Sequence, residues 1–499
     1  MPSALTYPGV YVEELPSGVR TVTGVATSIA LFIGWATRGP VDKAVRITSF
    51  ADFERAYGGL DARSPLGYAV RHFYDNGGAD AYVVRLAKDA VSATGAKGDL
   101  NITATSPGQW GNGYKISTAL RPSPDDDRFR LDVLDANNGD AVVESFSNLS
   151  MDPSDPQQRF VESVINGRSS LITVSVASAS LVAPANTPAV SLSGGDDGAL
   201  LKPNDADFNS ALLASSLFGL GSITDRIDLF NLVCVPGETD PATLAILQKH
   251  CKDQRAFLIV DADPAQSVAD YNAGAPSAIT GDSAPNSAMF FPWVKAPDPL
   301  QAGALRDFPP CGFVAGVFAR TDATRGVWKA PAGSAASING ATGLAVTMSD
   351  AENGQLNPLA INCLRTLPVY GNVVWGSRTL HGQTDRGSEW KDIPVRRTAL
   401  FIEESLYRGT QWVVFEPNDE PLWAQIRLNI GAFMHGLFRQ GAFQGSTPKQ
   451  AYFVKCDSET TTQADINLGI VNILVGFAPL KPAEFVVLKL QQIAGDIPT

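Results

Sequence analysis

The sequence predicts a multidomain protein that combines α/β and α+β domains. The chain has 499 residues, which is too long for one compact core and leads us to expect roughly three domains. Buried-strand and helix patterns alternate in residues 27–95 and again in residues 199–370. Residues 96–198 differ, because short alternating stretches lie there between clusters of turn residues. Residues 371–499 again mix helix and strand patterns and form a last unit.

The first 22 residues are expected to form an extended N-terminal arm. The segment Val10-Tyr11-Val12-Glu13 alternates like a strand, and Pro16 and Gly18 end it. No partner strand lies nearby in the sequence, and a lone strand leaves its backbone groups unpaired. We therefore expect this strand to pair with a distant strand, either in this chain or in another.

An α/β domain is assigned to residues 23–95 together with residues 199–370. In the first part we expect a strand at 29–34, a helix that begins at 50 with Ser49 as its N-cap, a helix over 64–76 and a strand at 81–86. In the second part we expect a strand at 229–235, a helix over 240–252 and a strand at 256–260. This β-α-β spacing predicts a parallel pair of strands with a right-handed crossover.

The intervening residues 96–198 are predicted to be a small β-sandwich inserted into the α/β domain. Its expected strands are 114–120, 129–134, 141–146 and 171–176.

The last unit, residues 371–499, is predicted to be α+β. We expect a helix at 395–408, a strand at 411–415, a helix at 421–440 and strands at 451–455, 470–477 and 483–490. The apolar face of the helix at 421–440 contains Leu422, Trp423, Ile426, Ile430, Phe433, Met434 and Leu437. Its polar face is predicted to contain Gln425, Asn429, Gly436 and Gln440.

Composition excludes several classes of partner. Lys and Arg total 39 against 51 Asp and Glu, and the formal charge of −12 argues against binding to nucleic acid or to anionic membranes. No apolar run reaches the ~18 residues that a membrane span requires. The five cysteines are scattered without a C-x-x-C pair, which is typical of buried thiols in a reducing compartment.

Residues that carry catalysis are sparse, so we expect no catalytic, cofactor-binding or metal site. The four histidines have no zinc-ligand spacing, and the chain contains no phosphate-binding glycine motif and no G-x-S-x-G motif. Asp261 and Asp263 follow a predicted parallel strand and could bind a metal, but a strand-end turn is the favoured interpretation. Arg396 and Arg397 could bind an anion, although ion pairs in a first helical turn are favoured.

Many ordered motifs nevertheless point to one family. They are Tyr7-Pro8-Gly9-Val10-Tyr11-Val12-Glu13, Phe291-Pro292-Trp293-Val294, Pro309-Pro310-Cys311-Gly312-Phe313-Val314-Ala315-Gly316, Arg320-Thr321-Asp322 with Arg325-Gly326-Val327-Trp328-Lys329-Ala330-Pro331-Ala332, Leu356-Asn357-Pro358, Trp375-Gly376-Ser377-Arg378-Thr379-Leu380, Phe401-Ile402-Glu403-Glu404-Ser405, Phe415-Glu416-Pro417-Asn418-Asp419, Val475-Gly476 and Pro482-Ala483-Glu484-Phe485-Val486-Val487. With these motifs the chain resembles, over nearly its whole length, the tail sheath proteins of contractile phage tails and related injection systems, including tailocins.

The resemblance implies a fold and an assembly. The middle domain would resemble subtilisin without its catalytic triad, the inserted β-sandwich would lie on the outside, and the C-terminal domain would face inward. Subunits would form six-fold rings, stacked helically around an inner tail tube, that contract to drive the tube through a target cell envelope. Baseplate and tail terminator proteins are the further partners implied. The expected location is the tail sheath of a virion, after assembly in the cytoplasm of a bacterial host.

The resemblance also implies two sets of contact residues. Terminal arms would add strands to sheets of neighbouring subunits, and Arg427 and Arg439 would face the inner tube. The arm contacts would be made by Tyr7, Val10, Tyr11, Val12 and Glu13 at the N-terminus and by Phe485, Val486, Val487 and Leu488 at the C-terminus.

Two other functions remain as alternatives at this point. A subtilisin-like fold could belong to a hydrolase, which an active-site serine probe would detect. A static tube or coat protein would assemble without contracting, and electron micrographs would then show tubes of one length.

Overall fold

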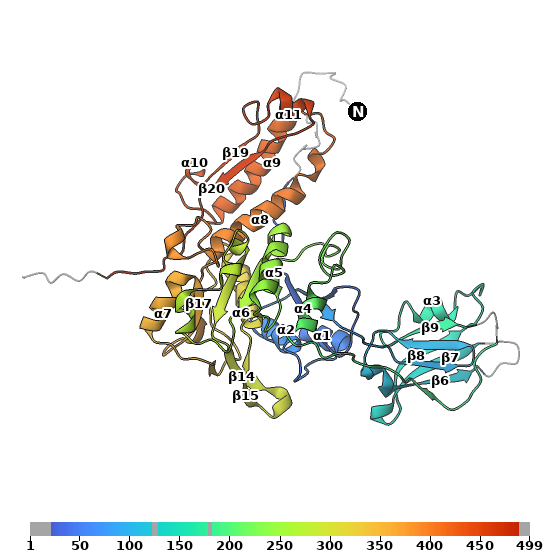
Figure 1. Cartoon of the computed structure of the whole chain (residues 1–499). Helices are drawn as coiled ribbons and strands as arrows, with labels where there is room; N and C mark the ends of the chain where they lie inside the picture. The colour runs from blue at the N-terminus through green and yellow to red at the C-terminus, as the bar shows by residue number, and fades with distance from the viewer. Residues whose placement is uncertain (1–20, 122–127, 178–181, 489–499) are drawn as a thin grey trace, which may run out of the picture. The chain divides into compact units, whose positions relative to one another are not determined.

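The computed structural model describes residues 21–121, 128–177 and 182–488 (Figure 1). Its contacts divide the chain into two compact units. Among the described residues, unit 1 contains 21–26, 325–329 and 394–488, and unit 2 contains 27–324 and 330–393. This division differs from the expected boundaries, because residues 371–393 belong to unit 2 and residues 23–26 belong to unit 1.

Unit 2 is built on an eight-stranded sheet. In sheet order its strands are β18 (Gly371–Val374), β17 (Ile361–Leu367), β13 (Ser287–Phe291), β12 (Phe257–Asp261), β11 (Leu232–Cys234), β1 (Ala30–Trp35), β3 (Ala81–Leu86) and β2 (Val45–Ile47). The strands from β17 to β3 are parallel to their neighbours, whereas β18 and β2 are antiparallel edge strands. The predicted parallel pair, β11 and β12, is therefore confirmed.

The central strands are continuous apolar runs because the sheet is covered on both faces. All six residues of β1 are buried, which is typical of a parallel strand between two layers of helices. The helices of unit 2 outside residues 96–198 are α1 (Phe50–Tyr57), α2 (Leu66–Asp75), α4 (Ala206–Leu212), α5 (Pro241–Asp253), α6 (Cys311–Arg325) and α7 (Asp350–Leu356).

Local capping explains where two of these helices begin. The Ser49 side chain accepts a hydrogen bond from the Asp52 N–H at 3.2 Å, as predicted for α1. Asp240 accepts from the Thr243 N–H at 2.8 Å, and Pro241 occupies the first turn of α5.

Helix α6 packs against α2 without space for additional side-chain atoms. A Cβ atom at Gly312 would lie 2.4 Å from the Ala69 carbonyl oxygen, and one at Gly316 would lie 2.6 Å from the Phe73 carbonyl oxygen. These two glycines permit the backbones to approach so closely, and most of α6 is buried as a result.

Residues 94–191 form two antiparallel sheets around a hydrophobic core of their own. One sheet contains β4 (Thr94–Lys97), β5 (Leu100–Ala104) and β9 (Ile172–Val176), and the other contains β10 (Val190–Ser191), β6 (Tyr114–Leu120), β7 (Phe129–Asp135) and β8 (Ala141–Leu149). A short helix, α3 (Val161–Ile165), follows β8. The four strands predicted in this segment are present.

Side chains cap the outer edge of β9. Asn166 donates to the Val174 carbonyl and accepts from the Val174 N–H, as a neighbouring strand would. Glu162 accepts from the Val176 N–H at 2.6 Å. This edge is thereby closed to strand addition.

Arg85, a residue of β3, connects the start of this two-sheet segment to the central sheet. Its buried guanidinium donates to the carbonyl oxygens of Ala36, Thr37, Gly39 and Pro107. Burial lowers its pKa to about 10, and four of its five N–H donors are satisfied by these carbonyl oxygens. A further small sheet of unit 2 contains β15 (Ala304–Phe308), β14 (Val294–Asp298) and β16 (Gly343–Leu344).

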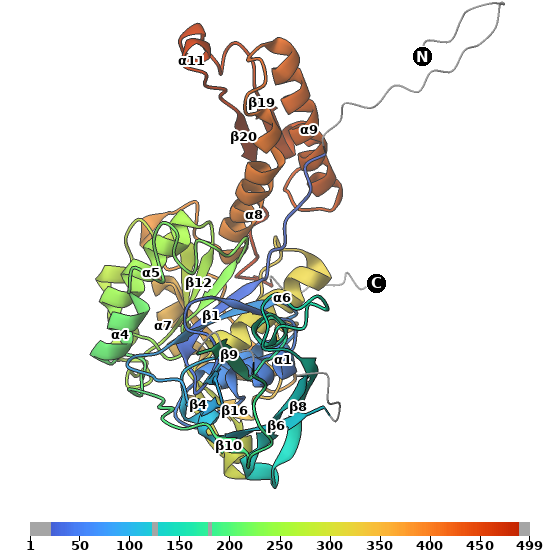
Figure 2. The same ribbon diagram turned by 90° about the vertical axis from the view of Figure 1, so that its right-hand side faces the viewer.

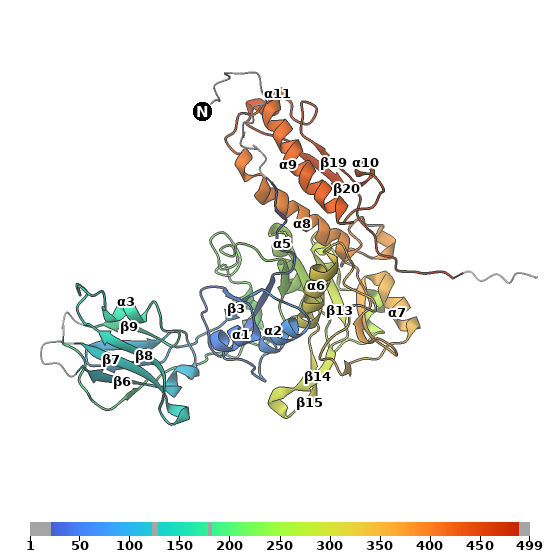
Figure 3. The same ribbon diagram turned by 180° about the vertical axis from the view of Figure 1, so that it is seen from behind.

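Unit 1 is a pair of long helices with a two-stranded sheet (Figure 3). Its elements are α8 (Ile393–Gly409), α9 (Glu420–Arg439), α10 (Pro448–Ala451), β19 (Tyr452–Lys455), α11 (Gln463–Asn467) and β20 (Leu474–Phe477). Asp419 caps α9 by accepting from the Leu422 N–H, and Pro421 lies in its first turn, as predicted. None of the helices in the described ranges is long and apolar enough to cross a membrane.

One predicted strand of this region, at 411–415, is wrong, and the one at 483–490 is not formed within the described part of the single chain. Residues 411–413 form a 3-10 turn, and the following Val414 and Phe415 are exposed. Residues 483–488 have no regular secondary structure. Both segments are rich in β-branched or aromatic residues, but among the residues that the structure describes neither has the paired neighbour that a strand needs.

Candidate functional site

Three of the four histidines occupy structural positions, and His435 is exposed on α9. His72 stacks on Phe313 with ring centroids 3.8 Å apart, and burial lowers its pKa to about 3. Burial likewise lowers the pKa of His250 to about 4. His381 Nδ1 lies 2.7 Å from Ser388 Oγ, but that hydroxyl also accepts from the Trp390 N–H, so the pair closes a local loop. Within the described ranges, no group of three or more His, Cys, Asp or Glu residues could hold a metal ion.

Asp261 ties together backbone segments at the carboxyl end of the central sheet. Its Oδ2 accepts from the Gly237 N–H at 2.9 Å, and its Oδ1 accepts from the Cys311 N–H, at the start of α6, at 2.7 Å. Asp263 Oδ1 accepts from the Ala265 N–H, as expected for a strand-end turn. Both carboxylates are thus engaged by the backbone, which supports the turn interpretation over a metal site.

Asp261 should make the stability of the protein depend on pH. Burial raises its pKa to about 6, whereas an unfolded Asp titrates near ~3.9. The folded state therefore favours the protonated form, so this contribution is fully present below about pH 4 and is lost as the pH rises through about 6. We expect Asp261→Asn to remove about 3 kcal/mol of pH dependence between pH 4 and 7, measured by chemical unfolding. Identical pH profiles for the two proteins would contradict this assignment.

The predicted N-terminal arm contacts lie outside the described residues. These are Tyr7, Val10, Tyr11, Val12 and Glu13. The predicted C-terminal contacts are described, and there Phe485, Val486, Val487 and Leu488 are each more than three-quarters exposed. Four consecutive exposed apolar side chains are unusual on an isolated protein surface.

The two-stranded sheet of unit 1 has one buried face and one exposed face. Tyr452, Val454, Val475 and Phe477 pack against the core of the unit. On the opposite face, Phe453 is 48% exposed and its ring covers Gly476, where a Cβ atom would lie 2.2 Å from the ring. An isolated two-stranded sheet is marginally stable, so the packing on α9 must hold this one together.

Helix α9 presents its two predicted tube-facing arginines differently. Arg427 pairs with Glu420 at 2.6 Å and also donates to the Cys456 carbonyl, whereas Arg439 is exposed at the end of the helix. The apolar face packs in one core with Val22, Ile402 and Phe443. Trp412 and Val413 pack against this core as predicted, although they lie in a 3-10 turn and not in a strand. Asn429 was predicted on the polar face but is 97% buried, and neither of its side-chain polar atoms has a hydrogen-bond partner among the described residues.

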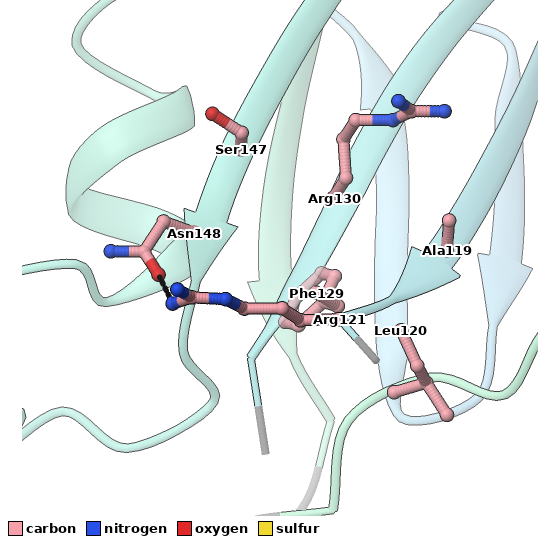
Figure 4. Close-up of a pocket in the computed structure, with 7 residues that line it drawn as sticks. All are labelled: Ala119, Leu120, Arg121, Phe129, Arg130, Ser147 and Asn148. Atoms are coloured by element: carbon pink, nitrogen blue, oxygen red, sulfur yellow. Dashed lines mark hydrogen bonds between the residues drawn. The ribbon is translucent and has the colours of Figure 1, made fainter. Parts of the chain in front are cut away.

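An open pocket, which no motif in the sequence indicated, lies on the sheet that contains β6, β7 and β8 (Figure 4). Its volume is about 530 Å³, and it is lined by Ala119, Leu120, Arg121, Phe129, Arg130, Ser147 and Asn148. Arg121 donates to the Asn148 side-chain oxygen at 3.2 Å across one side of it. Arg130 pairs with Asp132 at 2.9 Å. The lining residues come from the ends of three strands, which no local motif in the sequence brings together.

Comparison with protein families assigns most of the chain. A model described as the phage tail sheath protein central domain matches residues 227–380, and one described as the phage tail sheath C-terminal domain matches residues 385–493. Together they span more than half of the chain. A third, described as DUF2586, N-terminal domain, matches residues 7–279.

Two curated relatives are themselves tail sheath proteins. A putative prophage major tail sheath protein of Pseudomonas aeruginosa is 28% identical over 185 residues, which cover 36% of this chain and 45% of that protein. The tail sheath protein of Vibrio phage KVP40 is 25% identical over 189 residues, which cover 38% of this chain and 27% of that protein. The alignments thus span less than half the length of either relative.

Solved structures share the fold over almost the full length. The helical sheath of the anti-feeding prophage in its contracted state matches with a TM-score of 0.60 and 24% identity, covering 98% of this chain and 100% of that chain. A chain in the six-fold symmetrised baseplate of the same prophage matches with a TM-score of 0.59, 24% identity and the same coverage. These likenesses confirm a mixed, multidomain α/β fold. The chain belongs to the phage tail sheath family, and it is accordingly a structural sheath protein and not an enzyme.

Proposed function

We propose that the chain is the subunit of a contractile tail sheath that polymerises around an inner tube and shortens to drive the tube through a target cell envelope. The observation that carries the proposal is the full-length match to the contracted sheath, combined with the family assignment. Six subunits form each ring and the rings stack helically, an arrangement supported by the six-fold symmetry of the matching baseplate.

Each part of the chain has a place in this proposal. The α/β domain of unit 2 is subtilisin-like in fold and serves as the body of the subunit. Residues 96–198 are an inserted β-sandwich on the outside of the sheath, and unit 1 faces the tube. The side-chain caps on the β9 edge support this placement, because an outer domain with a closed edge does not recruit strands from other particles.

Exchange of terminal arms connects the subunits. The β19–β20 sheet accepts strands from neighbouring subunits, and the exposed Phe485–Leu488 segment together with residues 7–13 supplies them. Ordering four residues costs roughly 4–8 kcal/mol, whereas ladder hydrogen bonds return about 1 kcal/mol each. Burial of apolar side chains, at about 1.5–3 kcal/mol each, must supply the remainder. Each arm is therefore weak alone, and the lattice gains stability by repetition.

Contraction releases free energy if the shortened lattice buries more surface between subunits than the extended lattice does. Subunits move nearly as rigid bodies, and the arms keep the mesh connected during the movement. Baseplate and tail terminator proteins bind the two ends of the sheath. The sheath assembles in the cytoplasm of a bacterial host and becomes part of the virion tail.

Arg439 is the better placed of the two tube-facing arginines, because Arg427 is already paired within α9. We expect Arg439→Ala to weaken tube binding by no more than about 1 kcal/mol per subunit, since exposed ion pairs contribute little. Binding of the unchanged protein should fall between low and high salt, and the variant should lose part of that dependence. The measurement is co-sedimentation with purified tubes. Equal salt dependence of tube binding for both proteins would show that Arg439 is not part of the tube interface.

Electron microscopy of sheaths assembled around tubes tests the proposed function. We expect a long state and, after treatment with a chaotrope or a baseplate trigger, a shorter and wider state. Tubes of a single length under all conditions would support the static coat instead. Cleavage of a generic ester that is lost in a Ser388→Ala variant would favour a hydrolase.

A further inference from the structure

Residues 22–25, at the base of the N-terminal arm, pack on the core of unit 1. Val22 is 4% exposed and belongs to the same hydrophobic core as Ile402, Leu422 and Trp423. Figure 2 shows this segment, in dark blue, running beside the helices α8 and α9. The segment is connected to unit 2 through Thr27, whose hydroxyl donates to Asp322 at 2.7 Å.

Two glycines allow this segment to pack closely on its neighbours. A Cβ atom at Gly409, the last residue of α8, would lie 2.7 and 2.8 Å from the two methyl groups of Val22. A Cβ atom at Gly24 would lie 2.9 Å from the Phe401 ring, which itself packs on Phe433. Because neither glycine has a left-handed backbone, their absent side chains serve close packing and not a turn.

A hydrogen bond fixes the segment along α8. The Val25 N–H donates to the Ser405 hydroxyl at 3.2 Å, and Ser405 is fully buried. Packing at Val22 and Gly24 and this bond at Val25 therefore hold three of four consecutive residues. An extended segment without a strand partner would otherwise leave its backbone free to move.

We infer that Val22 is the anchor of the N-terminal arm, a positioning residue that fixes the point and direction in which the arm leaves unit 1. The inference rests on the proposed exchange of arms. An anchored base reduces the conformations that the arm must lose when it reaches a neighbouring subunit. The anchored base also transmits tension on the arm during contraction to the core of unit 1 and not to the connection at Thr27.

A double-mutant cycle with full-length protein tests the anchor. Val22→Ala opens a gap beside Gly409, and Gly409→Ala places a methyl group against Val22. In the double variant the new methyl group occupies the space that the valine methyl groups vacate, and the shortest contact that remains is the one of 3.1 Å to the Val22 Cβ position. We expect each single variant to raise the critical concentration for sheath assembly around tubes by roughly tenfold, and the double variant to recover to within about threefold of the unchanged protein.

A matched core variant separates anchoring from general stability. Leu437→Ala truncates another buried side chain of the same core. At a temperature where all variants remain folded, it should raise the critical concentration less than Val22→Ala does. Hydrogen exchange at the Val25 amide should be faster in Val22→Ala and slower again in the double variant.

The outcomes distinguish the anchor from the arm itself. If the Val22→Ala variant assembles normally while deletion of residues 1–20 prevents assembly, the anchoring role of Val22 is refuted and the exchange of arms is supported. A double variant that assembles no better than either single variant would also overturn the anchor. Normal assembly after the deletion would overturn both.

Discussion

Deletion of residues 1–20 should leave a folded protein that no longer assembles into a sheath. The described core of unit 1 includes Val22 and the core of unit 2 begins with β1, so both retain their contacts without the deleted residues. We expect the melting temperature to change by less than about 2 °C, while the critical concentration for assembly rises at least about a hundredfold. Thermal unfolding and sedimentation with tubes measure the two effects separately.

Point variants in the arm provide the control for this deletion. Val10→Pro removes a backbone donor and should weaken assembly more than Val10→Ala, provided that the arm forms a ladder of hydrogen bonds. Equal effects would show that only the side chain matters. Sheaths of normal length from the truncated protein would refute arm exchange, and an aggregated monomer would show that the arm pairs within its own chain.

Substitution of Gly312 by Ala should destabilise the protein by roughly 3 kcal/mol, which is a large effect for one methyl group. The added Cβ atom would lie 2.4 Å from the Ala69 carbonyl oxygen and 2.7 Å from the Ala69 Cα, so two buried helices would have to separate. Chemical unfolding of the purified variant measures the loss.

Gly354 offers a matched control for that substitution. It also lies within a helix, α7, but a Cβ atom there would meet no other atom within 4 Å. Gly354→Ala should therefore be neutral or stabilise the protein by up to about 1 kcal/mol, because alanine favours the helix. Equal destabilisation by both substitutions would show that close packing of α6 on α2 is not the cause.

Elements with strong local signals could be predicted from the sequence. The apolar run at β1, the N-caps Ser49 and Asp240 and the spacing between β11 and β12 each gave the correct element or pairing. In these cases the residues that decide the structure lie within a few positions of one another. The same holds for α8 and α9, whose apolar positions recur at helical spacing.

Elements that depend on distant neighbours could not be predicted. Residues 411–415 combine β-branched and aromatic side chains, but Phe415 adopts a positive φ of 71° and is fully exposed in the connection between two helices. Asn429 has the spacing of a polar face, yet tertiary packing buries it. The packing of Val22 in the core depends on Gly409, which is far away in the sequence. Propensity is a weak prior when such contacts decide the outcome.

The proposed contact site was only partly accessible to prediction for a related reason. The strands β19 and β20 were predicted approximately, because each alternates over its own residues. Residues 483–490 also have the composition of a strand, but a strand requires a partner, and the partner proposed for Phe485–Leu488 belongs to another subunit. A single chain cannot show that pairing.

A cryo-EM reconstruction of the sheath assembled from this chain tests the account most directly. We expect six subunits per ring, with the backbone of Phe485–Leu488 hydrogen-bonded to an edge of the β19–β20 sheet of a neighbouring subunit. The side chains that are exposed in the single chain should then be buried. A sheath in which these four residues remain exposed, or pack on their own subunit while both edges of that sheet stay unpaired, would contradict the account.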